Sequence, residues 1–190
     1  MTTLIRNVTL SILLVLAPVS GVLADEYADA IQAFKGAGQS GELFKTAYGY
    51  AVFPTIGKGG LVVGGARGKG QVYEKGKHIG DATMTQITAG LQAGGEAFSE
   101  IIFFENKAAL DQFTQGNFEF GAQAQAVAIT AGASAGASTG GGASASASAT
   151  QHDAAAAGAY YKGMAVFTVA KGGLMYEASI GGQKFNYKPL

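Results

Sequence analysis

The apolar and polar positions of this chain follow two periods, one typical of helices and one of strands. Within residues 25–47, apolar side chains recur at helical spacing at Tyr27, Ile31 and Phe34. Three glycines between residues 36 and 41 interrupt this run, and glycine weakens a helix interior. The pattern predicts two short helices, one on each side of the break.

After residue 48 the period of the apolar positions shortens to two, which indicates strands. The sequence EKGK at 74–77 joins two of these strands as a hairpin, because its glycine can adopt the backbone angles of a tight turn. Residues 107–115 return to helical spacing, with Asn106 suited to the N-cap. The strand-like segments are 50–53, 61–63, 71–73, 78–79, 83–98, 101–104, 118–130, 164–168, 174–179 and 184–187.

Glycine is unusually frequent and is spread through the strand-like text. The chain has 30 glycines in 190 residues, more than twice the average share of about 7%. Glycine inside strands marks bulges, bends and close approach of backbones. We therefore predict an α+β fold: a strongly curved, mostly antiparallel sheet, barrel-like or sandwich-like, with N-terminal helices and one internal helix.

One internal segment has a restricted composition. Residues 131–150 contain only Ala, Gly, Ser and Thr, which is the composition of a flexible linker. The sequence ASASASAT at 143–150 nevertheless keeps a strict period of two. The segment is therefore either a small-residue hairpin packed on the sheet or a disordered loop.

The N-terminus indicates export. A basic residue, Arg6, precedes an apolar run, and small residues lie before Asp25, which is the pattern of a cleaved signal peptide. We expect residues 1–24 to be removed and residues 25–190 to form a single domain. There is no cysteine, so the fold depends on its apolar core without disulfides. We expect the protein to be periplasmic or secreted. If it binds a membrane, we expect it to do so as a peripheral protein.

The chain contains nearly the same phrase twice. AVFPTIGKGGL occupies positions 51–61 and AVFTVAKGGL occupies positions 165–174. Each copy is an apolar strand followed by Lys-Gly-Gly, and two glycines allow the chain to reverse. We expect two hairpins related by an approximate twofold axis, with Lys58 and Lys171 projecting from a common side. The two Lys-Gly-Gly turns either bind anions, or they serve only as sequences that favour a hairpin turn.

Charge is balanced overall but uneven along the chain. Lys and Arg total 13, as do Asp and Glu, so no nucleic-acid partner is expected. Residues 57–77 and the last 30 residues are locally basic. We expect the side chains of Phe53 and Ile56 to insert into the apolar layer of a membrane. The candidate lipid-binding or anion-binding residues are Lys58, Gly59, Gly60, Arg67, Lys69, Lys171, Gly172 and Gly173.

Catalytic and metal-binding patterns are weak. The two histidines, His78 and His152, lack partners at metal-ligand spacing. No G-x-S-x-G sequence is present, and the glycine-rich text at 65–70 lacks phosphate-loop spacing. We expect neither enzymatic activity, nor a cofactor, nor a metal.

Four blocks carry a resemblance to a known family. GYAVFPTIGKGGLVVGGARGKGQVY (49–73), GLQAGGEAFSEIIFFENKAALDQF (90–113), FEFGAQAQAVA (118–128) and GLMYEASIGGQKFNY (173–187) resemble successive blocks of the SYLF domain family. That family occurs in bacterial exported proteins and in eukaryotic membrane-trafficking and actin-associated proteins. The resemblance implies a lipid-binding module, with phosphoinositide and actin binding attributed to eukaryotic members.

For an exported bacterial member, the resemblance carries over only general recognition of anionic phospholipid or of another envelope anion. The alternative is an envelope structural or protein-interaction protein whose basic face is incidental. An envelope protein would then be the partner. Charge reversal at Lys58 and Lys171 separates these two hypotheses.

Overall fold

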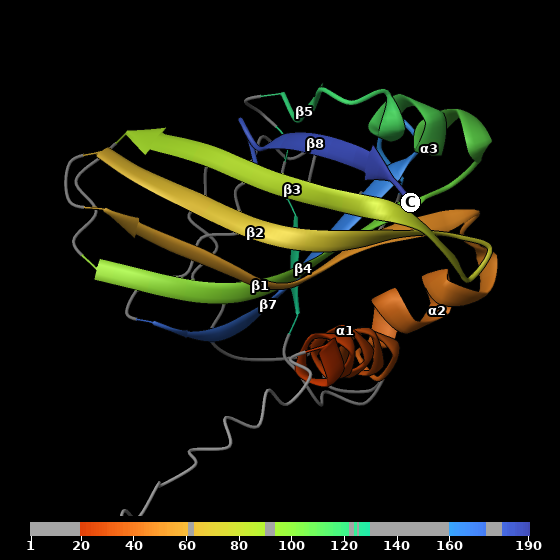
Figure 1. Ribbon diagram of the computed structural model, residues 1–190, viewed down its shortest axis with the longest axis horizontal. Helices are drawn as coiled ribbons and strands as arrows, with labels where there is room; N and C mark the ends of the chain where they lie inside the picture. The colour runs from red at the N-terminus through yellow and green to blue at the C-terminus, as the bar shows by residue number, and fades with distance from the viewer. Residues whose placement is uncertain are drawn as a thin grey trace, which may run out of the picture.

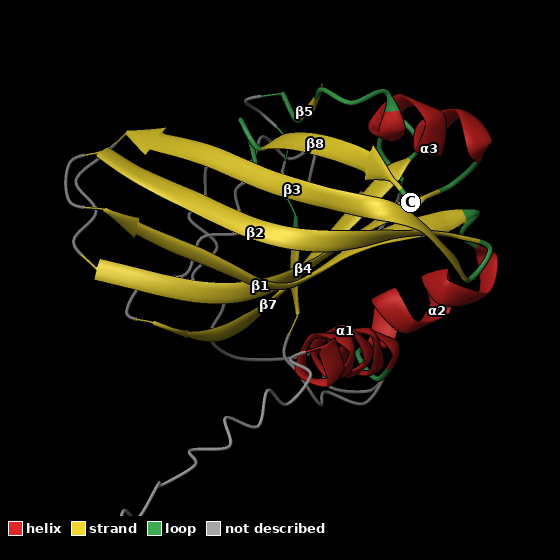
Figure 2. Cartoon of the chain, viewed as in Figure 1, coloured by secondary structure: helices red, strands yellow, loops and turns green. Residues whose placement is uncertain are grey.

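The computed structural model describes residues 20–60, 63–89, 94–121, 124, 126–129, 160–173 and 180–190. These residues form helices along one end of a long, curved sheet (Figures 1 and 2). The elements in chain order are α1 (Ser20–Lys35), α2 (Gly38–Thr46), β1 (Gly49–Gly60), β2 (Val63–Glu74), β3 (Lys77–Ala89), β4 (Gly94–Phe104), α3 (Lys107–Thr114), β5 (Phe118–Glu119), β6 (Val127–Ile129), β7 (Met164–Gly173) and β8 (Lys184–Pro189).

The sheet has eight strands in the order β5-β8-β3-β2-β1-β4-β7-β6. Neighbouring strands are antiparallel except β6 and β7, which are parallel. The rings of Phe53 on β1 and Phe185 on β8 lie 5.5 Å apart, although β2 and β3 separate their strands. In a flat sheet three strand spacings would hold them about 14 Å apart. The sheet is therefore strongly curled, which confirms the predicted fold class.

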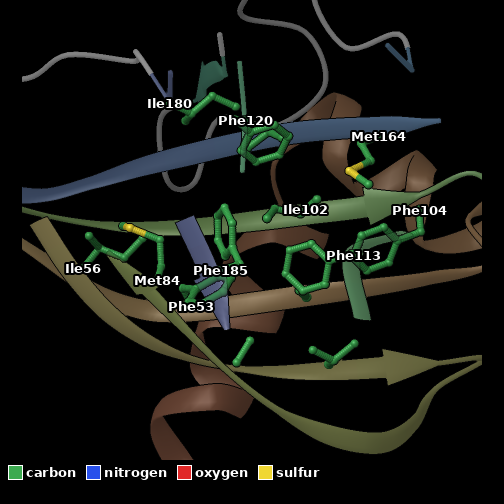
Figure 3. Close-up of a cluster of buried hydrophobic side chains, with 14 of the residues drawn as sticks. Phe53, Ile56, Met84, Ile102, Phe104, Phe113, Phe120, Met164, Ile180 and Phe185 are labelled. Atoms are coloured by element: carbon green, nitrogen blue, oxygen red, sulfur yellow. The ribbon is translucent and has the colours of Figure 1, made fainter. Parts of the chain in front are cut away.

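The inner face of the curl carries the larger apolar cluster (Figure 3). Phe53 and Ile102 contribute to it from the central strands, and Phe185 closes it from β8. Helix α3 adds Leu110 and Phe113, both buried. Ring contacts of 5.0–5.6 Å link Phe113 to Phe104, Phe118 and Phe185. The residues of this inner core come from both ends of the chain.

The outer face carries a second cluster beneath the N-terminal helices. Phe34 of α1 is fully buried there and packs in the same cluster as Val52, Ile101 and Phe167. Phe44 of α2 meets Phe103 edge to face at 4.9 Å. The central strands β1, β4 and β7 are therefore buried on both faces, which explains their nearly continuous apolar sequences.

The predicted helices and the predicted hairpin are confirmed. The N-terminal helical pattern divides between Lys35 and Gly38. Asn106 caps α3, where its Oδ1 accepts a hydrogen bond from the Ala109 N–H at 3.0 Å. The turn between β2 and β3 has positive φ angles at Lys75 and Gly76, 48° and 81°, as a two-residue hairpin turn requires.

Several predicted strand boundaries are wrong. The segment predicted as one strand over 118–130 contains two short strands, β5 and β6, and residues 120 and 121 after β5 are not in a strand. The strand predicted over 50–53 does not stop at Pro54 but continues to Gly60 through a bulge. The bulge lets proline lie in a central strand. The alternating segment 83–98 divides between β3, which ends at Ala89, and β4, which begins at Gly94.

Several predictions concern residues outside the described part of the chain. They include most of the expected signal peptide, the segment 131–150 and the strand 174–179. Among the described residues, no helix combines the length and the apolar character that crossing a bilayer requires.

Candidate functional site

The two copies of the repeated phrase lie on either side of β4. Val52 of β1 and Phe167 of β7 are both opposite Ile101. Because β4 is antiparallel to each of them, β1 and β7 run in the same direction. Because β4 separates the two copies, they do not pair with each other, and the prediction of two hairpins that pair about a twofold axis is wrong.

The copies are offset by one residue along β4, and this offset reverses their faces. Ala51 is opposite Ile102, whereas its counterpart Ala165 is opposite Phe103. Successive side chains of a strand point to opposite faces. Phe53 therefore belongs to the inner cluster, while Phe167 belongs to the outer cluster.

The Lys-Gly-Gly sequences lie inside strands and do not form turns. Gly59 and Gly60 end β1 and pair with Gly65 and Gly64 of β2. A Cβ atom at Gly60 would clash with Gly64, so glycine here permits close approach of two strands. In the second copy Gly172 and Gly173 end β7 opposite Ala97 and Glu96.

Lys58 points into the curl and forms a buried ion pair. Its Nζ lies 3.5 Å from Glu96 Oε1, and the two side chains are only 8% and 4% exposed. The ion pair satisfies both charges, because leaving either one alone in the interior would be costly. The expectation that Lys58 projects outward for anion binding is wrong.

The two residues expected to insert into a membrane are also buried. Phe53 and Ile56 are both 0% exposed and belong to the inner core. The bulge at Pro54 and Thr55 adds one residue between them, so both side chains reach the same face. The sequence FPTI is therefore core packing and not an exposed tip.

Lys171 lies on the outer side of the sheet. It is the extra residue of a bulge in β7, between Ala170 and Gly172. The exposed Lys171 Nζ donates to Thr55 Oγ1 at 2.9 Å, and Thr55 in turn contacts Glu26 Oε1 of α1 at 3.3 Å. Lys58 and Lys171 therefore lie on opposite faces, which contradicts the predicted shared surface.

Arg67 and Lys69 are exposed on the outer face of β2. Their strand neighbours are Thr85 and Thr83 on β3, and Gly57 lies beside Arg67 on β1. In the part of the chain that the structure describes, neither cation makes an ion pair. The two charges therefore stand above small residues, where an anion can approach them.

Two large apolar side chains on the same face complete this surface. Val63 is 67% exposed and Ile87 is 82% exposed. Ile87 pairs with Gly65 of β2. Val63 and Arg67 lie two positions before and two positions after Gly65, so their side chains point to the same outward side of β2. We call Val63, Arg67, Lys69 and Ile87 the distal patch, because they lie on strands that extend past α1 and α2 (Figure 1).

Sequence reasoning did not find Val63 and Ile87. The sequence TMTQITA at 83–89 alternates, but its row of apolar residues changes face between Met84 and Ile87. The buried Met84 brings Gln86 inward with it, and Gln86 Nε2 donates to the Gly181 carbonyl at 2.9 Å. The signal in the sequence is the change of face between Met84 and Ile87: if Met84 and Gln86 point inward, Ile87 must point outward.

The inner face also holds a second acid. Glu100 is fully buried, with one neighbour on each copy of the phrase, Phe53 and Thr168. Gln183 Nε2 donates to Glu100 Oε2 at 3.0 Å. Burial raises the pKa of Glu100 from 4.5 to about 7, although the Gln183 hydrogen bond opposes the shift. This carboxyl group therefore titrates near neutral pH inside the fold.

Comparison with known proteins identifies relatives. A family model described as "Ysc84: Las17-binding protein actin regulator" matches residues 85–187. The chain is also 31% identical over 147 residues to Beta cell expansion factor A of Aeromonas veronii. This alignment covers 75% of the chain and 47% of that protein. The chain thus spans about half the length of the curated relative that it matches.

Proposed function

The chain belongs to the Ysc84 family, the SYLF family of non-catalytic domains. From this membership we propose that it is a non-enzymatic lipid-binding module. It binds anionic phospholipid membranes through the distal patch. The observation that carries the proposal is the presence of Arg67 and Lys69 next to exposed Val63 and Ile87 on one outer surface. Cations attract anionic headgroups, and the aliphatic side chains enter the apolar layer.

The expected affinity is moderate. Each cation near an anionic membrane contributes about 1 kcal/mol, and Lys171 on the same outer face adds to Arg67 and Lys69. Complete burial of Val63 and Ile87 contributes roughly 2 kcal/mol each. These contributions reach about 7 kcal/mol at most, a dissociation constant on the order of ten micromolar. The apolar and ionic parts are both necessary at this affinity.

Vesicle sedimentation tests the proposal directly. The protein should sediment with vesicles of phosphatidylcholine and phosphatidylglycerol, and much less with phosphatidylcholine alone. Arg67→Glu/Lys69→Glu should weaken anionic binding by at least tenfold. Ile87→Ser should weaken it by up to about thirtyfold, since burial of this side chain contributes roughly 2 kcal/mol, without removing its dependence on salt. Equal sedimentation with neutral and anionic vesicles contradicts the proposal.

The matched control is Lys45→Glu/Lys77→Glu. This variant changes net charge by the same amount, on α2 and at the start of β3, away from the distal patch. Both lysines are exposed. If this control weakens binding as much as Arg67→Glu/Lys69→Glu does, total charge and not the patch determines the affinity.

The description of the family favours one second candidate, a protein partner, because it names binding to the protein Las17. In this alternative, Val63 and Ile87 form the centre of a protein interface and the nearby cations are its rim. A photo-crosslinker introduced at position 87 in the native host distinguishes the two candidates. Crosslinks to one protein, combined with no vesicle binding, would favour the protein partner.

We also propose that the protein is exported to the periplasm or secreted after removal of residues 1–24. Cleavage after Ala24 would shorten α1, which begins at Ser20. It would leave the buried residues Ala30 and Phe34 in place. Mass measurement of the protein from a periplasmic fraction should give a chain that begins at Asp25. An intact N-terminus in a cytoplasmic fraction would contradict this.

A further inference from the structure

A cleft of about 300 Å³ lies at the helical end of the molecule, far along the sheet from the distal patch. The end of α1, the end of α2, the start of β1 and the β2–β3 turn surround it. Figure 1 shows that turn beside α2. The residues that define its chemistry are Lys35, Phe44, Tyr48, Gly49, Tyr50 and Lys75.

Aromatic rings form the walls of the cleft. Phe44 and Tyr50 meet edge to face with ring centres 5.1 Å apart, and Phe44 also contacts the buried Phe103. Tyr50 stacks on Tyr73 at 4.9 Å. These contacts fix the rings without covering them completely, since Phe44, Tyr48 and Tyr50 remain only half-buried. A flat apolar group can therefore pack against rigid rings.

Two small residues, Ala47 and Gly49, also line the cleft. A Cβ atom at Gly49 would lie 2.5 Å from the Tyr73 carbonyl oxygen. Glycine is therefore required here by the close approach of β1 to β2.

Two ammonium groups border the space. Lys35 Nζ lies 5.5 Å from the centre of the Phe44 ring, and Lys75 Nζ lies 5.0 Å from that of the Tyr48 ring. Within the described residues, neither lysine makes an ion pair. The nearby carboxylate of Glu74 accepts a hydrogen bond from the Tyr48 hydroxyl at 2.6 Å. Two positive charges thus share one cleft with no acid among its lining residues.

Lys75 is held in position by the backbone. Its N–H donates to the Tyr48 carbonyl at 3.0 Å, which ties the hairpin turn to the start of β1. Lys35 ends α1, where the helix dipole favours a cation. The C-terminal ends of α1 and α2 each present about half a negative charge, less than the two full positive charges of the lysines.

We propose that this cleft binds a small organic anion. A carboxylate or phosphate group lies between the ammonium groups of Lys35 and Lys75, and an aromatic or short apolar body packs on Phe44 and Tyr50. The volume is at the lower limit of known ligand sites, so the ligand is no larger than a substituted single ring or a short acyl chain. The site is independent of membrane docking through the distal patch.

Amide chemical shifts of the full chain during titration test this site. Phenyl phosphate is the main probe; inorganic phosphate lacks the apolar body, and benzylamine reverses the charge. Phenyl phosphate should shift the amide signals of Gly49 and Gly76 and bind at least tenfold more tightly than either comparison compound. Dihexanoyl phosphatidic acid, used below its micelle concentration, distinguishes a lipid headgroup from a free phosphate ester.

The test variant is Lys35→Gln/Lys75→Asn, because asparagine tolerates the positive φ of position 75. It should weaken phenyl phosphate binding by at least tenfold. Lys45→Gln/Lys77→Gln is the matched control and should bind as the parent does. Arg67→Glu/Lys69→Glu should also bind phenyl phosphate normally, which separates this site from the membrane proposal. Unchanged binding in the test variant, or equal binding of benzylamine, would overturn the inference.

Discussion

The two copies of one phrase have nearly the same residues and opposite surroundings. In β1, Lys58 is buried against Glu96, and Phe53 lies in the inner core. In β7, Lys171 is exposed beside Thr55, and Phe167 lies under the N-terminal helices. Both strands pair with β4 in the same direction, so direction does not explain the difference.

The difference arises from register. A shift of one residue along β4 exchanges the two faces of a strand, and the copies differ by that shift at their first residue. Each strand also contains one bulge, at a different place in the phrase. A repeated sequence in a sheet therefore does not predict a repeated surface unless the register of each copy is known.

The largest expected effect tests the buried lysine of the first copy. Lys58→Ala leaves Glu96 charged and buried without its ion-pair partner, so we expect a loss of about 4 kcal/mol in the free energy of unfolding. Chemical denaturation followed by circular dichroism measures this. Lys58→Met/Glu96→Leu should recover most of the loss, since neither charge then remains. A loss below about 1 kcal/mol in Lys58→Ala would show that Lys58 is solvated.

The next effect concerns Glu100, the residue that pairs with both copies. Its pKa is raised to about 7, so the folded state keeps a proton that the unfolded chain loses near pH 4.5. The contribution of Glu100 to stability is therefore most favourable below about pH 4.5 and declines as pH rises from about 4.5 to 7. Glu100→Gln should remove this decline and be more stable than the parent at pH 8 by about 3 kcal/mol.

Unfolding free energies at pH 4, 6 and 8 measure the Glu100 effect. Glu105→Gln, at an exposed position immediately after β4, is the matched control, because it removes one carboxylate outside the buried core. Parallel pH profiles for the parent and Glu100→Gln would contradict a buried titrating carboxyl group at this position.

A smaller effect tests whether the two phenylalanines of the phrase lie on opposite faces. Phe53 contacts Phe185 at 5.5 Å, so Phe53→Leu and Phe185→Leu should be coupled by about 1 kcal/mol in a double-mutant cycle. Phe167 belongs to the other cluster, and Phe167→Leu should be additive with Phe185→Leu to within about 0.5 kcal/mol. Equal coupling in the two cycles would show that the phenylalanines share one face.

The smallest effect concerns the exposed lysine of the second copy. Lys171→Ala removes one surface hydrogen bond to Thr55, and we expect a change in unfolding free energy below about 0.5 kcal/mol. Thr55→Ala should have a similarly small effect. If Lys171→Ala destabilises the fold as much as Lys58→Ala does, the comparison between the two copies fails.

Local signals in the sequence predicted the local structure well. Gly36 lies at the break between two helices, although Gly38 and Gly41 belong to α2; Asn106 caps α3, and the glycine of EKGK makes the β2–β3 turn. Each of these features depends on a few neighbouring residues. The curvature was predicted from the distribution of glycine, and the contact between Phe53 and Phe185 confirms it.

The candidate site was predicted only in part. Arg67, Lys69 and Lys171 are exposed on the outer face, as a surface role requires, whereas Lys58, Phe53 and Ile56 are buried. A lysine beside two glycines resembles a turn when it is read locally. Its position depends on Glu96, which lies 38 positions later in the chain and meets it only through strand pairing.

Composition and period alone determined that this chain forms helices followed by a curved, glycine-rich sheet, because those preferences act between near neighbours. Tertiary structure decided which face each strand turns inward, because one-residue offsets and bulges are set by the pairing of β4 with β1 and β7. The burial of Lys58 and the pKa of Glu100 follow from that pairing, and the exposure of Ile87 follows from the pairing of β3 with β2. Side-chain environments in a sheet depend on partners that are distant in sequence, and local pattern carries little information about them.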